Sequence, residues 1–238
     1  MIKFILIAFI ILVILVALNY STFTKIIDPV TIILTCTVNV HDNINTLKMK
    51  NADERKNIYL KSIKNWLYKT NFNIIVVENS GYSFPELKQE LIKFKNRFEI
   101  ISKHIILNDS SKGIHEIYAI NYAYNNSKLI KLLDENSIVI KVTGRYFIPQ
   151  LEEYIGQNSF NIITQNNPKN CEMLGCKKKY FNNLFNMNIE KFMFFPVYIE
   201  NVYFKRTSLF PKNEVLNSKL FQIEPTKNGG YGVLKSVL

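Results

Sequence analysis

Cysteine is scarce in this chain, which has three cysteines among its 238 residues. A structural zinc site takes about four ligands at suitable spacing, and no further ligands stand near Cys171 and Cys176. This pair is close enough in the sequence for a local disulfide if the domain lies on the lumenal side of a membrane. Cys36 falls in a predicted strand, where we expect a small buried hydrophobic residue. The cysteine content therefore predicts no zinc centre.

The chain also lacks internal repeats, a linker that would divide it, and any recognisable nucleic-acid-binding module. Its formal net charge is +11, but the lysines are scattered instead of clustered among stacking aromatic residues. The charge has two readings: a Lys- and Asn-rich composition of an AT-rich genome, or attraction to anionic partners such as nucleotide diphosphates or a membrane surface. We expect one domain and no nucleic-acid partner.

The first segment is a long apolar run. Residues 4–18 are unbroken apolar sequence, and Lys3 is the only charged residue before Lys25. A spanning helix needs about 20 residues, and the segment offers no small-x-small cleavage site. We therefore expect an uncleaved membrane anchor over residues 1–20, then a stalk over 21–29 and one domain over 30–238. Lys3 favours a cytosolic N-terminus, which makes the protein a single-pass type II membrane protein.

Buried strands alternate with amphipathic helices along the first two thirds of the domain. This order predicts an α/β fold, with a mostly parallel Rossmann-like sheet that helices cover on both faces. The pattern predicts strands at 31–40, 72–77, 98–102 and 138–147, and helices at 53–69, at 85–96 and from Lys112 onward.

Polar residues follow three of these strands. In a parallel sheet the carboxyl ends of the strands share one edge, and ligands bind there. The candidate ligand-binding residues at these ends are Thr35, Thr37, Asn39, Glu78, Asn79, Ser80, Thr143, Gly144 and Arg145.

Two of the candidate positions suit a phosphate. Lys112 and Gly113 provide a cation and free backbone N–H groups at a helix start, although a glycine before a helix is also common without function. Arg145 can hold a diphosphate by paired hydrogen bonds, or it can form a structural salt bridge. Glu78 is open to two readings as well, a ligand for base or ribose, or the cap of the following turn.

Taken together, these segments resemble the GT-A-type glycosyltransferases. They resemble more narrowly the small glycosyltransferases of large DNA viruses and of some capsule-making microbes, over roughly residues 30–180. The resemblance implies a nucleotide-sugar donor, with its base and ribose at the first two strand ends and the Lys112–Gly113 helix nearby. It also implies a glycan or glycoprotein acceptor.

One departure from this family concerns metal. Metal-dependent members carry Asp-x-Asp after the fourth strand, where this chain has Thr143, Gly144 and Arg145, and no Asp-x-Asp occurs anywhere in the sequence. Either Arg145 and Lys112 replace the metal or catalysis is lost, so we expect a transferase without a divalent metal cofactor. The alternatives are a non-catalytic nucleotide- or glycan-binding module and, third, a nucleotidyltransferase. A nucleotidyltransferase of this architecture normally has a Gly-rich phosphate loop after the first strand, where this chain has residues 38–41.

An inverting transferase also needs a carboxylate that accepts the proton of the acceptor hydroxyl. The candidates are Glu200, in an aromatic segment, and Glu172, between the two later cysteines. Glu116 ranks lower because it falls inside a predicted helix. Each of these can equally be an ordinary surface carboxylate, and a retaining mechanism needs no such base.

Overall fold

The computed structural model of the protein describes residues 29–40, 48–105, 112–187, 198–229 and 232–238. The expected anchor at residues 1–20 lies outside the described residues, as does all of the expected stalk except residue 29. Among the helices that are described, none combines the length and apolar character that a membrane span needs.

The described part of the chain forms a mostly parallel seven-stranded sheet in the order β3-β2-β1-β4-β6-β5-β7. β1 pairs in parallel with both β2 and β4, whereas β6 runs antiparallel to both of its neighbours. This confirms the predicted α/β class. The strands are β1 (Val30–Cys36), β2 (Asn73–Glu78), β3 (Phe98–Ser102), β4 (Ile138–Thr143), β5 (Ile162–Thr164), β6 (Met173–Lys177) and β7 (Val215–Asn217).

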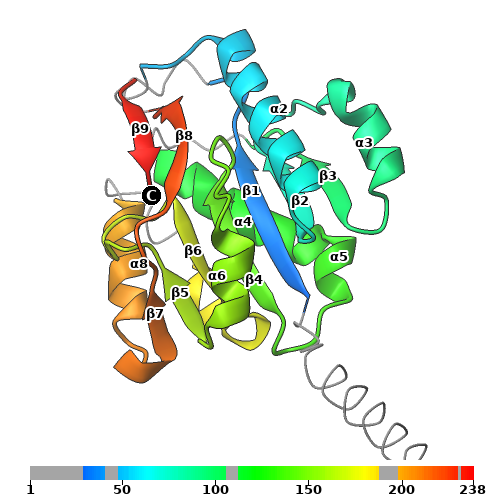
Figure 1. Ribbon diagram of the computed structural model, residues 1–238. Coiled ribbons are helices and arrows are strands. Elements are labelled where there is room, and N and C mark those ends of the chain that lie inside the picture. The colour runs from blue at the N-terminus through cyan, green and yellow to red at the C-terminus, as the bar shows by residue number, and fades with distance from the viewer. Residues whose placement is uncertain (1–28, 41–47, 106–111, 188–197, 230–231) are drawn as a thin grey trace, which may run out of the picture.

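Helices cover both faces of the sheet (Figure 1). Every residue of β1 is buried, as expected for a central parallel strand between two helical layers. The helices are α2 (Ala52–Lys69), α3 (Lys88–Lys93), α4 (Lys112–Asn126), α5 (Lys128–Lys131), α6 (Leu151–Gln157), α7 (Phe181–Leu184) and α8 (Ile199–Thr207). Short 3₁₀ turns are η1 (Pro85–Leu87), η2 (Lys178–Tyr180) and η4 (Lys212–Glu214).

Two hydrophobic cores follow from the alternation of side chains along β1. Ile32 and Leu34 point to one face, where they join the core that contains Trp66 of α2. Ile33 points to the opposite face and joins the core that contains Ile117 of α4. Both helices are therefore held against the central strands, and each presents polar residues where β1 and β4 end.

A small antiparallel sheet of β8 (Gln222–Lys227) and β9 (Leu234–Val237) closes the described chain. It lies beside α2 (Figure 1), to which Lys61 and Lys227 connect it by ion pairs with Glu224 and Glu54. The sequence pattern did not predict these two strands.

Several expected boundaries differ from the structure. The first strand ends at Cys36 rather than at residue 40, and the fourth ends at Thr143 rather than at residue 147. α2 begins at Ala52, because the side chain of Asn51 caps it by accepting a hydrogen bond of 2.9 Å from the Glu54 N–H.

The expected local disulfide is contradicted. Cys171 and Cys176 are both buried free thiols. Most of the chain between them is the extended strand β6, which separates two residues five apart by roughly 15 Å. A disulfide needs Cα atoms within about 7 Å of each other, so this pair cannot close.

Candidate functional site

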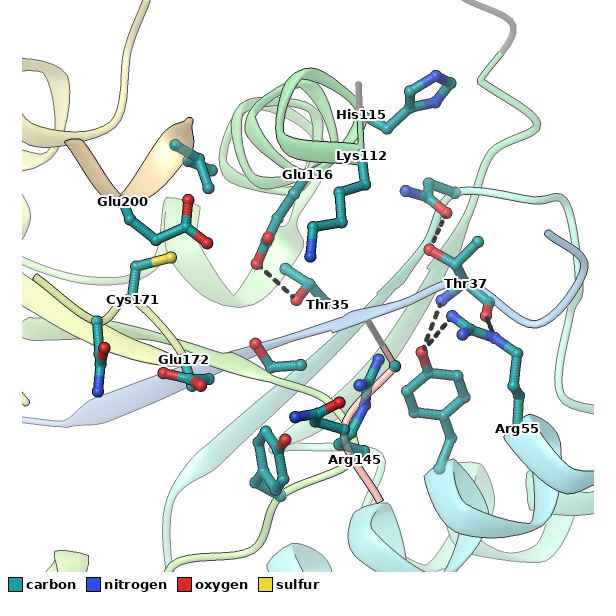
Figure 2. Close-up of a pocket in the computed structure, with 18 residues that line it drawn as sticks. Thr35, Thr37, Arg55, Lys112, His115, Glu116, Arg145, Cys171, Glu172 and Glu200 are labelled. Carbon is teal, nitrogen blue, oxygen red and sulfur yellow. Dashed lines mark hydrogen bonds between the residues drawn. The ribbon is translucent and has the colours of Figure 1, made fainter. Parts of the chain in front are cut away.

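A cavity of about 270 Å³ lies where β1 and β4 end and α4 begins. From β1 the chain proceeds outward to β2 and β3, then crosses back to place β4 on the other side of β1. Such a reversal opens a crevice at the carboxyl ends of the two strands, which is the usual ligand site of an open α/β sheet. Figure 2 shows the residues that line the cavity.

The structure brings most of the predicted site residues together in the wall of this cavity. Those in the wall are Thr35, Thr37, Asn79, Lys112, Thr143, Arg145, Glu172 and Glu200. Those outside it are Asn39, Glu78, Ser80, Gly113 and Gly144.

Glu78 lies behind the cavity wall and connects two loops. Its side chain is fully buried, and its carboxylate accepts hydrogen bonds from the backbone N–H groups of Val38 (2.8 Å), Ser80 (2.9 Å) and Tyr82 (2.7 Å). The Ser80 hydroxyl in turn accepts one from the Asn39 N–H at 3.0 Å. Both oxygens of Glu78 thus accept hydrogen bonds that tie the loop after β1 to the loop after β2.

Gly144 is required by close packing. A Cβ atom there would lie 2.4 Å from the Cys36 Sγ and 2.8 Å from the Thr35 carbonyl oxygen. The Gly144 N–H donates to that same carbonyl at 2.9 Å, which continues the contact between β1 and β4 past the end of the sheet. Gly113 is buried in the first turn of α4 and supports Lys112 without reaching the cavity.

Arg55, which the sequence analysis did not identify, organises the α2 side of the cavity. It is 3% exposed, and its guanidinium donates to the carbonyl oxygens of Thr37 (2.6 Å) and Met49 (3.2 Å) and to the Tyr59 hydroxyl (3.0 Å). Each of its three guanidinium nitrogens donates one hydrogen bond within the protein, so Arg55 fixes the end of β1 and orients Tyr59.

Arg145 lies half-buried in the same wall and is hydrogen bonded to the Tyr59 hydroxyl. Burial alone would lower the pKa of Arg145, but the adjoining tyrosine hydroxyls and Glu116 raise it above its ordinary value. A Cβ on Gly229 would lie 2.6 Å from one guanidinium nitrogen, so the turn after β8 covers this side chain closely. Arg145 therefore stays charged and has donors left for a ligand.

Glu116 faces the cavity from the first turns of α4. Its carboxylate accepts a hydrogen bond of 3.2 Å from the Thr35 hydroxyl and forms an ion pair with Lys141, which also donates to the Cys171 carbonyl oxygen. Burial lowers the pKa of Lys141, but Glu116, Cys171 and Glu172 together outweigh burial, and the pKa lies above its ordinary value. Lys141 therefore keeps its charge inside the sheet.

The other two carboxylates lie across the cavity from Arg145 and Arg55 (Figure 2). Glu172 forms an ion pair with Lys235 of β9; burial raises the pKa of Glu172, but Lys235 outweighs it and the pKa lies below its usual value. Glu200 stands in the first turn of α8 and lines the cavity. The wall of this one cavity thus carries three carboxylates as well as the cations of Lys112, Arg55 and Arg145.

No group of three or more His, Cys, Asp or Glu side chains in the described ranges is arranged to hold a metal ion. The guanidinium of Arg145 lies just after the end of β4. The ammonium of Lys141 belongs to the strand itself, two residues before its last residue, Thr143.

Comparison with known proteins gives no family model and no curated protein that matches the chain. Among solved structures, residues 1–349 of TarS from S. aureus align with 81% of this chain and 59% of their own, at 13% identity and a TM-score of 0.45. A nucleotide-diphospho-sugar transferase from Desulfovibrio desulfuricans G20 aligns with 79% of each chain, at 14% identity and a TM-score of 0.43.

The glycosyltransferase GlyE of Streptococcus pneumoniae TIGR4 aligns with 81% of this chain and 46% of its own, at 10% identity and a TM-score of 0.44. The chain thus spans less than two thirds of the aligned TarS and GlyE chains. These bacterial structures do not bear on the resemblance to viral enzymes, and likenesses of this size establish neither a family nor an activity.

Proposed function

We propose that the chain is a GT-A-type glycosyltransferase, which transfers a sugar from a nucleotide-sugar donor to a glycan or glycoprotein acceptor. The observation that carries the proposal is the cavity of about 270 Å³ at the β1–β4 crevice, whose wall holds both cationic side chains and carboxylates. This combination suits an inverting glycosyl transfer, because negative charge develops on the leaving diphosphate while a proton leaves the acceptor hydroxyl.

The donor diphosphate would be held by Lys112 and Arg145. Lys112 is the first residue of α4, so it adds an ammonium to the free N–H groups of a helix N-terminus. Arg145 offers a planar pair of donors that matches phosphate oxygens. Fixed cations can stabilise the charge on a leaving group, so this proposal needs no divalent metal.

The nucleoside would lie against the ends of β1 and β2. Thr37 and Asn79 meet there through a hydrogen bond of 2.6 Å, and both line the cavity together with Thr35. Hydroxyl and amide groups of this kind suit the ribose and the edge of a base.

Glu200 is the proposed catalytic base, because among the described residues it is the carboxylate of the cavity that has no partner. Glu116 is paired with Lys141, and Glu172 is paired with Lys235. Within the described part of the chain, the Glu200 carboxylate makes neither a hydrogen bond nor an ion pair. It can therefore accept the proton of an acceptor hydroxyl that attacks the sugar.

The proposal includes the membrane anchor at residues 1–20, with a cytosolic N-terminus and the domain on the opposite side. What supports it is the unbroken apolar run and the position of Lys3. Carbonate washing of native membranes should leave the full chain in the pellet, and protease added to sealed vesicles should not reach the domain. Release by carbonate would refute the anchor.

The central experiment measures thermal unfolding of the full chain with a panel of nucleotide sugars, each with and without EDTA, and then release of nucleoside diphosphate with candidate acceptors. We expect that one nucleotide sugar of the panel raises the melting temperature. The protein should also release nucleoside diphosphate from that nucleotide sugar when EDTA is present. A donor that binds without transfer or hydrolysis would identify a non-catalytic binding module. Activity that EDTA abolishes would overturn the metal-free proposal.

A further inference from the structure

The edge of the sheet opposite the first cavity carries the amino ends of the parallel strands. β4 begins there beside β1, since Val30 pairs with Ile138. β6 runs antiparallel to β4 and ends at the same edge, where Lys177 pairs with Ile138. Figure 1 shows α5 beside the amino ends of β1 and β4. Nothing in the proposed transfer reaction uses this edge.

Three segments form one continuous surface at this edge. This amino-end surface comprises residues 127–137, 177–180 and 205–214. The Lys178 ammonium donates to the Leu133 carbonyl oxygen at 2.6 Å, which joins η2 to the turn before β4. The Tyr180 ring meets the Phe210 ring edge-on, with centroids 5.5 Å apart, which joins η2 to the loop after α8.

Two leucines project from the amino-end surface. Leu132, beside α5, and Leu209, beside α8, are each 83% exposed, more than any other large apolar side chain in the described ranges. A single exposed leucine is common in soluble proteins and needs no explanation. Two at one edge of the sheet, on either side of η2, can enter an apolar layer together.

Basic residues surround these leucines and outnumber the acidic residues of the amino-end surface by eight to three. Asp134 accepts hydrogen bonds from backbone N–H groups of its own turn, and Glu214 accepts one from the Asn161 amide. Glu135 lies 3.7 Å from Lys178, the single ion pair of this surface among the described residues. The eight basic residues are Lys128, Lys131, Lys177, Lys178, Lys179, Lys205, Arg206 and Lys212.

The amino-end surface lies where the proposed anchor connects to the domain. β1 begins at Val30, and residues 21–29 separate it from the anchor. A stretch of this length spans at most about 30 Å, so the amino end of β1 stays within that distance of the bilayer. The connection therefore raises the effective concentration of the surface at the lipid headgroups. The first cavity, at the other ends of β1 and β4, faces away from the bilayer in this orientation.

We propose that the amino-end surface docks on the bilayer that holds the anchor. Its lysines would contact anionic phospholipid headgroups, and Leu132 and Leu209 would enter the outer part of the apolar layer. Interfacial binding of proteins combines these two contributions, buried apolar area and the attraction of basic side chains to anionic lipid. The proposal rests on the anchor proposed above, and it needs neither sugar transfer nor one orientation of the anchor.

The three native cysteines are buried, so a cysteine added at the surface can be labelled selectively. Leu132→Cys and Leu209→Cys each place a fluorophore on the amino-end surface. Val233→Cys is the matched control, because Val233 is 60% exposed and its carbonyl oxygen accepts a hydrogen bond from Asn228, which lines the first cavity. Each full-length variant is reconstituted into phosphatidylcholine vesicles, with or without phosphatidylserine. The vesicles also contain a lipid that carries a nitroxide quencher near its headgroup.

With phosphatidylserine present, the labels at Leu132 and Leu209 should be quenched, and the label at Val233 should not. High salt should restore the fluorescence, because it screens the lysines from the headgroups. In the Leu132→Cys protein, Lys131→Glu together with Lys179→Glu should remove most of the quenching. Both lysines are exposed, so the melting temperature should be retained.

Lys88→Glu is the matched control for charge reversal. Lys88 is exposed and opens α3, which follows the carboxyl end of β2 instead of the amino end. This variant should be quenched like its parent.

Carbonate extraction of the same vesicles separates failure of the anchor from failure of the docking. A chain that carbonate releases would refute the anchor and this proposal with it. A chain that stays in the vesicles, with unquenched labels at Leu132 and Leu209, would refute the docking alone. Quenching that needs no phosphatidylserine, or that survives the charge reversals, would also overturn the proposal. A signal that depends on the amount of protein per vesicle would identify a second copy of the chain as the occupant instead of lipid.

Discussion

Lys141 and Glu116 form an ion pair at the inner wall of the first cavity, with the lysine 1% exposed in the middle of β4. A buried cation in a parallel sheet is costly unless it is paired and hydrogen bonded, and Lys141 meets both conditions through Glu116 and the Cys171 carbonyl oxygen. The pair fixes α4 against β4 and holds the Glu116 carboxylate in one place.

Replacing Lys141 with methionine should lower the free energy of unfolding by about 2 to 3 kcal/mol, because it leaves the partly buried Glu116 without its partner. The double variant Lys141→Met with Glu116→Gln should recover much of that loss. Urea unfolding of the wild type, the two single variants and the double variant gives the coupling free energy between the two side chains. A double variant as unstable as the sum of the two single variants would show that the pair does not act as a unit.

Stability should fall at alkaline pH because burial raises the pKa of the Cys171 thiol from 9.0 to about 12. The folded state then keeps a proton that the unfolded state loses, so rising pH favours unfolding between pH 9 and about 12. The free energy of unfolding should drop by up to about 1.4 kcal/mol per pH unit from this group. Cys171→Ala should make the measured slope shallower, and an unchanged slope would contradict the assignment.

Two glycines should respond differently to alanine. In Gly144→Ala the new methyl group would meet the Thr35 carbonyl and Cys36, which cannot withdraw, and we expect a loss of about 1–3 kcal/mol in urea unfolding. In Gly229→Ala it would meet the flexible end of Arg145, so the fold should tolerate it while donor affinity falls. Equal stability of the two variants would show that the β1–β4 contact relaxes easily.

Arg145→Lys should weaken donor binding or turnover on the order of 30- to 1000-fold, because an ammonium cannot reproduce a paired contact with a diphosphate. Binding isotherms and initial rates measure this, and chelators should leave the wild type active. The Tyr59 hydroxyl would lose its hydrogen bond with Arg145 but keep the one that it accepts from Arg55, so the melting temperature should change little. An unfolded Arg145→Lys protein would identify Arg145 as a structural residue.

Glu200→Gln should lower the rate of transfer about 10²- to 10⁴-fold and leave donor affinity unchanged, as expected for the loss of a general base. Glu172→Gln serves as the comparison, because that carboxylate is paired with Lys235 and should affect stability more than chemistry. The rate of transfer at saturating nucleotide sugar distinguishes the two variants, because it does not depend on donor affinity. If Glu172→Gln abolishes transfer and Glu200→Gln does not, the two roles are reversed.

The central strands could be predicted from the sequence because their burial on both faces leaves long β-branched runs, as in Ile138–Val142. β6 could not be predicted from the sequence, because Gly175 and Cys176 have little preference for a strand. These residues are held in β6 by its pairing with β4 and β5. β8 contains Pro225 and is mostly exposed, so its pattern resembles a loop.

The site was predictable only where polar residues follow a strand. Thr35, Asn79 and Arg145 carry that signal and lie in the cavity. Arg55 stands among other charged residues of α2 and cannot be distinguished in the sequence from a solvated helix face. Glu116 was ranked low because it is helical, but the first turns of α4 open onto the crevice, which only the tertiary arrangement reveals.

Arg145 belongs to the wall of the first cavity and also to the wall of a second cavity, of about 340 Å³, between α2 and the β8–β9 hairpin, and this has a thermodynamic consequence. Any molecule that draws the guanidinium towards one cavity must alter its position in the other. Linkage then requires that two occupants change each other's affinity by the same factor, in either direction. A single side chain thus couples ligand binding in the two cavities, even though the two bound molecules need not touch.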